Sequence, residues 1–132
     1  MAGEKSLEKL LKNISPELID GEFVFCTFQG SRYGDHLDLD PIASISELEG
    51  LTLVVPKAIA DNRRIDYESV FKGITLRVHS SLDAVGLTTA FSKKLTGHGI
   101  SANVIAGYYH DHIFVQSEYA EKAIDALKEL AR

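Results

Sequence analysis

The sequence contains one cysteine, three prolines and no tryptophan among its 132 residues. One cysteine cannot close an internal disulfide, so side-chain packing and hydrogen bonds must hold the fold. Cys26 lies in the apolar run FVFCTF, where a small buried thiol is the expected state. The run offers no basic neighbour that would lower the pKa of this thiol, so no catalytic thiolate is predicted.

Basic residues are also scarce. The sequence has 14 Lys and Arg residues and 19 Asp and Glu residues. Basic residues are adjacent at Arg63-Arg64 and Lys93-Lys94. A nucleic-acid surface needs a concentrated basic patch, so the composition excludes one. No apolar run approaches the roughly 20 residues that span a bilayer, and MAGEKSLEKLL is not a secretory signal. We therefore expect a cytoplasmic protein with no nucleic-acid and no membrane partner.

The first half of the chain alternates short apolar patterns with turns. Apolar residues at helical spacing predict a helix over residues 7–14 with Ser6 as its N-cap, and Ser15-Pro16 predicts one more helical turn. The polar loop at residues 30–35 has two interpretations, a binding loop or an exposed connection. Alternation and turn residues further predict strands at 23–28, 41–48 and 51–55 and a short helix at 57–62.

The most informative stretch runs from Ile74 to Val115. Alternation predicts a strand at 74–78, and Ser80, Ser81 and Asp83 then supply side chains that cap helices. Helical spacing predicts a helix from Leu87 to Leu95, which Gly97 and Gly99 end. The remaining pattern predicts strands at 100–106 and 112–115, then a helix capped by Ser117 with an apolar stripe at Ala120, Ala123, Ile124, Leu127 and Leu130.

Gly86 stands at the predicted start of the first of these two helices. The first N–H groups of a helix lack intrahelical partners and carry partial positive charge, so a carboxylate or phosphate is able to bind there. Glycine has no Cβ, which allows a ligand or another part of the chain to come close. Two interpretations follow, an anion-accepting helix start or an ordinary strand-to-helix turn with a packing glycine.

Several motifs of this stretch resemble those of ACT domains. They are VGLT at 85–88, HGISANV at 98–104 and GYYHDHIFV at 107–115. FVFCTF at 23–28 and EGLTLVVP at 49–56 carry a weaker similarity into the first half. The whole chain resembles small bacterial proteins built of two ACT-like halves with no enzyme attached, and it is similar to the regulatory ACT pairs of aspartate kinases.

The resemblance implies an α+β fold of tandem ferredoxin-like halves, each with the order βαββαβ, an antiparallel sheet and helices on one face. We expect an N-terminal ACT-like half at residues 1–68 and a C-terminal ACT domain at 69–132. The first half lacks an obvious first strand and the second an obvious last one. Because open apolar edges rarely stay unpaired, we expect strand sharing between halves or pairing across a homo-oligomer to complete both.

The resemblance also implies a ligand site. In ACT domains an effector, typically an amino acid, lies where the glycine turn after the first strand meets the second strand of a neighbouring module. Backbone N–H groups of the turn would take a carboxylate, and backbone carbonyl groups near Val104 with the Asn103 amide would take an ammonium group. Asp83 would be either an ammonium partner or a cap. The implied ligand-binding residues are Asp83, Ala84, Val85, Gly86, Leu87 and Thr88 of the turn, with Asn103, Val104 and Ile105 of the facing strand.

Other chemistry has little support. His110 and His112 are two residues apart on a strand and so share a face, but no third metal ligand is evident near them, and no metal or cofactor is expected. No nucleophile elbow, phosphate-binding loop or dinucleotide fingerprint is present, so we expect no enzyme. The leading hypothesis is a non-catalytic regulatory module for a small amino acid. The alternative is an interaction protein that oligomerises through its sheet edges without a ligand.

Overall fold

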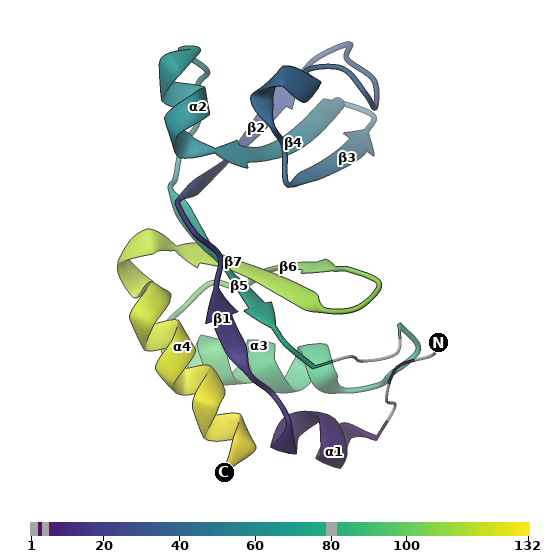
Figure 1. Cartoon of the computed structure of the whole chain (residues 1–132), viewed down its shortest axis with the longest axis vertical. Coiled ribbons are helices and arrows are strands. Elements are labelled where there is room, and N and C mark those ends of the chain that lie inside the picture. Colours follow the sequence, from purple (N-terminus) through teal and green to yellow (C-terminus); the bar gives the residue numbers. More distant parts are fainter. Residues whose placement is uncertain (1–2, 4–5, 79–81) are drawn as a thin grey trace. The chain divides into compact units, whose positions relative to one another are not determined.

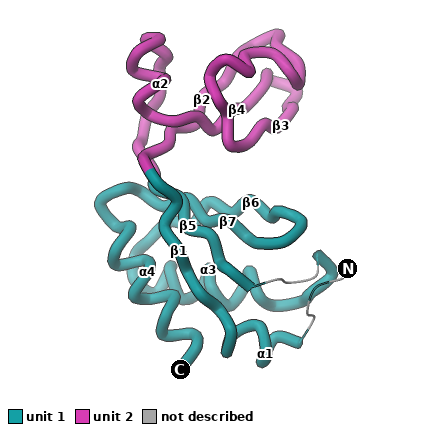
Figure 2. Tube along the Cα trace, in the orientation of Figure 1, with its two compact units in different colours: residues 1–20, 72–132 teal, residues 21–71 magenta. Residues whose placement is uncertain are grey.

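The computed structural model describes residue 3 and residues 6–78 and 82–132, and Figure 1 shows its helices and strands. Spatial contacts divide the chain into two compact units (Figure 2). Unit 1 consists of residues 1–20 and 72–132, and unit 2 of residues 21–71. This grouping by contact does not test the division into sequence modules at residues 68 and 69, which stays a prediction. Within the described ranges, every helix is too short or too polar to cross a membrane.

Unit 1 is built on a four-stranded sheet. Its strands are β1 (Pro16–Leu18), β5 (Phe71–Leu76), β6 (Asn103–Ala106) and β7 (Asp111–Gln116), in the order β6-β7-β5-β1. The N-terminal strand β1 runs antiparallel to β5 and so supplies the last strand that the C-terminal half lacks. The predicted strand sharing between the two halves is therefore confirmed for unit 1.

The helical turn predicted at Ser15-Pro16 is wrong, because Pro16 is the first residue of β1. Proline has no N–H to donate, yet the first position of a strand tolerates it. The residues around it complete the pairing with β5. The N–H of Ile19 donates to the carbonyl of Gly73 at 2.8 Å, and the N–H of Arg77 donates to the carbonyl of Ser15 at 2.8 Å.

The helices of unit 1 are α1 (Leu7–Lys12), α3 (Leu87–Gly97) and α4 (Ala120–Lys128), with 3-10 turns η2 (Ser117–Tyr119) and η3 (Glu129–Ala131). In Figure 1, α3 and α4 lie on one face of the sheet. The core between them confirms the predicted stripes, since Leu87, Phe91 and Leu95 of α3 are buried with Ala123 and Leu127 of α4. The cap predicted at Ser117 is wrong, because that residue begins η2 and α4 starts after Tyr119.

Unit 2 is a smaller antiparallel sheet of β2 (Phe23–Phe28), β3 (Ala43–Glu47) and β4 (Gly50–Pro56), in the order β3-β4-β2. The predicted strands and the predicted helix α2 (Lys57–Asn62) are confirmed. Between β2 and β3, where the βαββαβ pattern expects a helix, the only regular structure is the 3-10 turn η1 (Leu37–Leu39). The core of unit 2 includes Val24, Cys26, Leu51, Leu53 and Val55.

Candidate functional site

Gly86 is the N-cap of α3, and its backbone is left-handed with φ +98°. Glycine reaches this conformation without the strain that a side chain would cause. The Gly86 carbonyl accepts the N–H of Ala90 at 2.9 Å, and Gly86 itself has no side chain with which to cap the helix. The N-cap residue therefore does not occupy the N–H groups of the first turn, which lie at the positive end of an eleven-residue helix.

The N-cap residue of α3 is Gly86 and not Asp83, so the sequence prediction does not hold for the N-cap position. The chain needs a left-handed residue at the N-cap, and glycine at position 86 provides it. Asp83 lies three residues earlier and is exposed. The caps expected at Ser80 and Ser81 lie outside the described residues. The role of Asp83 as an ammonium partner stays a prediction.

The rest of the predicted turn divides between core and surface. Leu87 is 3% exposed, and Ala84 packs against the same core. Val85 is 83% exposed, and Thr88 is also exposed. Only the last two side chains are thus accessible to a ligand, whereas Ala84 and Leu87 would contribute through their backbone.

The predicted strand residues lie on both faces of β6. In the antiparallel pair with β7, Val104 stands opposite the core residue Ile113, so it faces the helices. Asn103 and Ile105 project to the other face, because successive strand residues alternate. The Asn103 amide donates from Nδ2 to the carbonyl of Phe114 at 3.1 Å. Within unit 1 the structure therefore does not bring Asn103 and Ile105 together with the start of α3.

The space beside Gly86 is filled from α1. A Cβ built on Gly86 would lie 3.1 Å from Leu7 Cδ2. Helix α1 is itself anchored by Leu10, which is fully buried in the core of unit 1. The packing interpretation of Gly86 therefore has direct structural support, and an incoming anion would approach the N–H groups rather than the Gly86 Cα. Sequence reasoning missed this contact, although Leu7 opens the apolar stripe of α1.

Asp111 is the functional candidate that sequence reasoning passed over. It begins β7, is 9% exposed, and is the buried charged residue of the described chain. It shares its face of the strand with the core residues Ile113 and Val115. Burial raises the pKa of its carboxyl, and the neighbouring His112 and His110 partly oppose that rise. A charged residue in register with buried aliphatic residues is the sequence signal that would have found it.

The two flanking histidines form hydrogen bonds that link the start of β7 to neighbouring segments. His110 Nδ1 donates to the carbonyl of Val78 at 3.4 Å, beside the segment that leads from β5 to α3. His112 Nδ1 and Thr75 Oγ1 share a hydrogen bond of 3.0 Å, and burial lowers the pKa of His112. Across residues 6–78 and 82–132, no three His, Cys, Asp or Glu side chains gather as metal ligands would.

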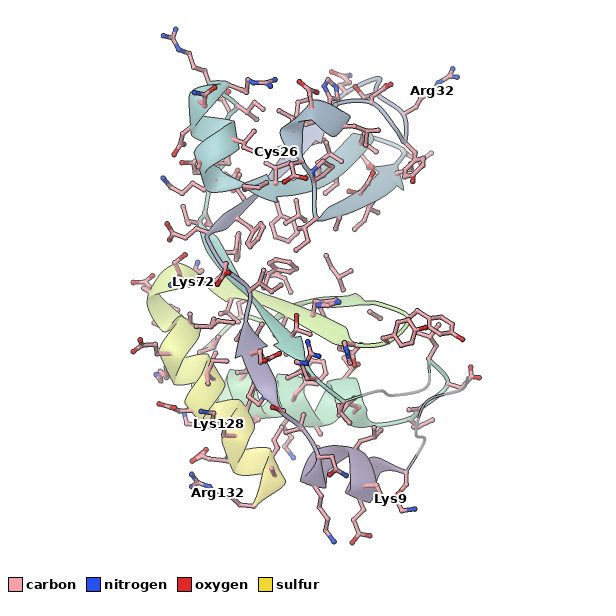
Figure 3. All side chains as sticks on the ribbon, viewed as in Figure 1. Lys9, Cys26, Arg32, Lys72, Lys128 and Arg132 are labelled. Carbon is pink, nitrogen blue, oxygen red and sulfur yellow. The ribbon has the colours of Figure 1, made fainter. Side chains whose placement is uncertain are left out.

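Two further residues of interest have structural roles. Cys26 lies within unit 2 (Figure 3), where burial raises the pKa of its thiol and so disfavours the reactive thiolate. Tyr108 and Tyr109 form an edge-to-face pair with ring centroids 5.1 Å apart, at the turn between β6 and β7. Both tyrosines are exposed.

Replacing Asp111 with Asn is expected to stabilise the unliganded protein at pH 7 by about 1 kcal/mol, the scale of an unpaired buried polar group. The folded state raises the carboxyl pKa, so wild-type stability falls as the pH rises through that value. The advantage of the variant should therefore shrink as the pH is lowered and the wild-type carboxyl becomes protonated. Urea unfolding at pH 7 and pH 4 measures this, with exposed Asp125→Asn as control. An unchanged or lowered stability at pH 7 would contradict the assignment of an unpaired carboxylate.

Two family models of the ACT domain match the sequence, one over residues 2–72 and one over residues 68–129. The chain belongs to the ACT domain family. The resemblance stated from the motifs is thus confirmed, as is the α+β fold class of two ferredoxin-like ACT halves. No curated protein matches this ACT protein.

Solved structures extend the comparison. The crystal structure of a protein of unknown function from Vibrio cholerae, described as a possible transport protein, is 56% identical, covers 97% of this chain and 98% of its own, and has a TM-score of 0.87. An Agrobacterium tumefaciens protein is 18% identical, with 90% of each chain covered and a TM-score of 0.72. The ligand-free regulatory subunit of aspartate kinase from Thermus thermophilus is 12% identical, covers 90% of this chain and 99% of its own, and has a TM-score of 0.64. At the identities of the last two, the likeness shows the fold alone.

Proposed function

We propose that this ACT protein is a non-catalytic regulatory module that binds a small amino acid at the start of α3. The observation that carries the proposal is the glycine N-cap at position 86, which has no side chain of its own to occupy the first-turn N–H groups. These groups suit the carboxylate of an amino acid. Family membership supports a regulatory ligand-binding module in general terms, and the buried thiol of Cys26 offers no nucleophile for catalysis.

The ligand-binding residues in this proposal are the predicted turn and strand. The turn from Asp83 to Thr88 would bind through its backbone. Asn103 and Ile105 would contribute from β6 of a second copy, because within one copy they lie on the face away from α3. In this proposal the site needs two copies of the chain, so the protein is a homo-oligomer. We place it in the cytoplasm. Binding would regulate a partner only through different ligand affinities for two states of the assembly.

A thermal-shift screen against the twenty amino acids tests this proposal. At 100 times its dissociation constant, a ligand adds about 2.7 kcal/mol of stability, so we expect at least one amino acid to raise the melting temperature by roughly 5–10 °C. No response across the panel would contradict the proposal.

A pair of variants at Thr88 locates the site. Thr88→Asp should keep the fold, because an acidic residue in the first turn suits the helix dipole, but it should weaken amino-acid binding about tenfold or more by repelling the ligand carboxylate. Thr88→Asn is the neutral control of the same size and should bind like wild type. Equal binding by both variants would place the ligand elsewhere.

The exposed edges of the two sheets favour a second candidate function. β6 is one terminal strand of the order β6-β7-β5-β1 and β3 is one of the order β3-β4-β2, and Ile45 of β3 is 44% exposed. Unpaired strand edges tend to pair with another chain. An interaction protein that assembles through these edges would give a concentration-dependent oligomer and a flat thermal-shift panel.

A further inference from the structure

Asp111 presents a buried charge that the fold does not explain. Its residue is 9% exposed, and the hydrogen bonds and ion pairs between described residues give its carboxylate no partner. Burying an unpaired carboxylate is costly, and proteins normally place a hydrogen-bond donor or a counter-charge against such a group. Asp111, at the first position of β7, therefore lacks the hydrogen-bond donor that a largely buried carboxylate usually has.

The position of Asp111 relates it to the start of α3. Because strand residues alternate, its side chain projects with Ile113 and Val115 into the core that also contains Leu87, the first residue of α3. The hydrogen bond from His110 to the Val78 carbonyl places the start of β7 beside the segment that leads to that helix. Asp111 and the first-turn N–H groups of α3 thus lie on the same face and at the same end of the sheet.

His110 and His112, the neighbours of Asp111 in sequence, oppose the rise in its carboxyl pKa only in part. His110 and His112 project to the opposite face of β7, and their ring Nδ1 atoms are engaged by the Val78 carbonyl and the Thr75 hydroxyl. A metal ion is not the expected counter-charge either. Divalent cations need several oxygen or nitrogen ligands, and no such group of three surrounds Asp111 in the described chain.

The chemistry of the two features is complementary. The α3 start accepts a negative group, whereas the Asp111 carboxylate accepts hydrogen bonds from a positive one. We infer that Asp111 binds the ammonium group of the ligand and restricts this site to α-amino acids, as opposed to carboxylic acids that lack an amine. The inference rests on the proposed function, since the ligand carboxylate is the group placed on α3.

Three matched pairs of compounds test the inference: L-alanine with L-lactate, L-aspartate with L-malate, and L-phenylalanine with L-phenyllactate. In each pair the carboxylate and side chain are retained, and a hydroxyl replaces the ammonium group. Affinities are measured by isothermal titration calorimetry at pH 7. For a pair that binds, wild type should prefer the amino acid about tenfold or more, because a charge-assisted hydrogen bond is lost with the ammonium group.

Three variants assign the preference to a residue. Asp111→Asn should abolish the preference by weakening amino-acid binding while hydroxy-acid binding stays within about twofold. Asp125→Asn removes an exposed carboxylate from α4 and should leave the preference intact. Asp83→Asn tests the other carboxylate considered for the ammonium group, and it too should leave the preference intact. Circular dichroism of each variant confirms the fold before titration.

The outcomes distinguish a failure of this inference from a failure of the proposed function. If wild type binds an amino acid and Asp111→Asn keeps the full preference, or if Asp83→Asn abolishes it, the inference is overturned while the amino-acid site stands. If wild type binds neither member of any pair and the twenty-amino-acid screen is flat, both fail. Loss of the preference in Asp111→Asn alone, with hydroxy-acid binding retained, supports the inference.

Discussion

Phe91→Ala is expected to lower the free energy of unfolding by about 3–5 kcal/mol, the usual range for deleting a buried aromatic side chain. Phe91 lies at the middle of α3, is 0% exposed, and packs in the core of unit 1. The cost combines lost apolar burial with the cavity left behind. Urea unfolding monitored by circular dichroism measures it.

Lys93→Ala is the matched control for this change. The residue lies on the same helix but is exposed, so its truncation should alter stability by no more than about 0.5 kcal/mol. If Phe91→Ala and Lys93→Ala cost the same, α3 does not pack on the sheet with the face that the structure gives it.

Gly50→Ala is expected to destabilise the protein by about 2–4 kcal/mol, through steric overlap and backbone strain together. Gly50 begins β4 with φ +154°, and an added Cβ would lie 2.9 Å from the carbonyl oxygen of Phe28 and 3.2 Å from the Cα of Gln29. Both neighbours are backbone, and Phe28 is fixed by its pairing with Leu51. Neither is able to move without disturbing the β2–β4 ladder.

Gly30→Ala separates the two causes. Gly30 also has a positive φ, +77°, but nothing lies within 4 Å of an added Cβ. Its replacement should therefore cost only the backbone strain, roughly 1–2 kcal/mol. Thermal and urea unfolding of the two variants give the comparison, and a larger loss for Gly30→Ala than for Gly50→Ala would show that the Phe28 contact is not the cause.

Most elements of this ACT protein follow from local patterns. The spacing of Leu87, Phe91 and Leu95 predicts α3, and the apolar alternation of residues 51–55 predicts β4, because burial on one face or both dictates those patterns. Helix α2 follows from Pro56, whose fixed backbone angle suits the position before a helix.

What local patterns failed to predict depends on distant partners. The three-residue strand β1 has no periodicity of its own, and its conformation is set by β5, which lies far along the chain. Leu7 fills the space beside Gly86 only because α1 docks there. Asp111 lies between two histidines that the sequence suggests as possible metal ligands. Its burial depends on the packing of β7 against the core, which the sequence around it does not reveal.

The insertion of unit 2 between β1 and β5 has a kinetic consequence. Leu18 pairs with Ile74, and the whole of unit 2 lies between them in the sequence. Bringing such distant segments of an unfolded chain together has an entropic cost of loop closure. Within unit 2, Phe23 pairs with Phe71, so its two ends meet once it has formed. Prior formation of unit 2 would then shorten the effective loop for β1, making this N-terminal strand a late addition to a nucleus built elsewhere.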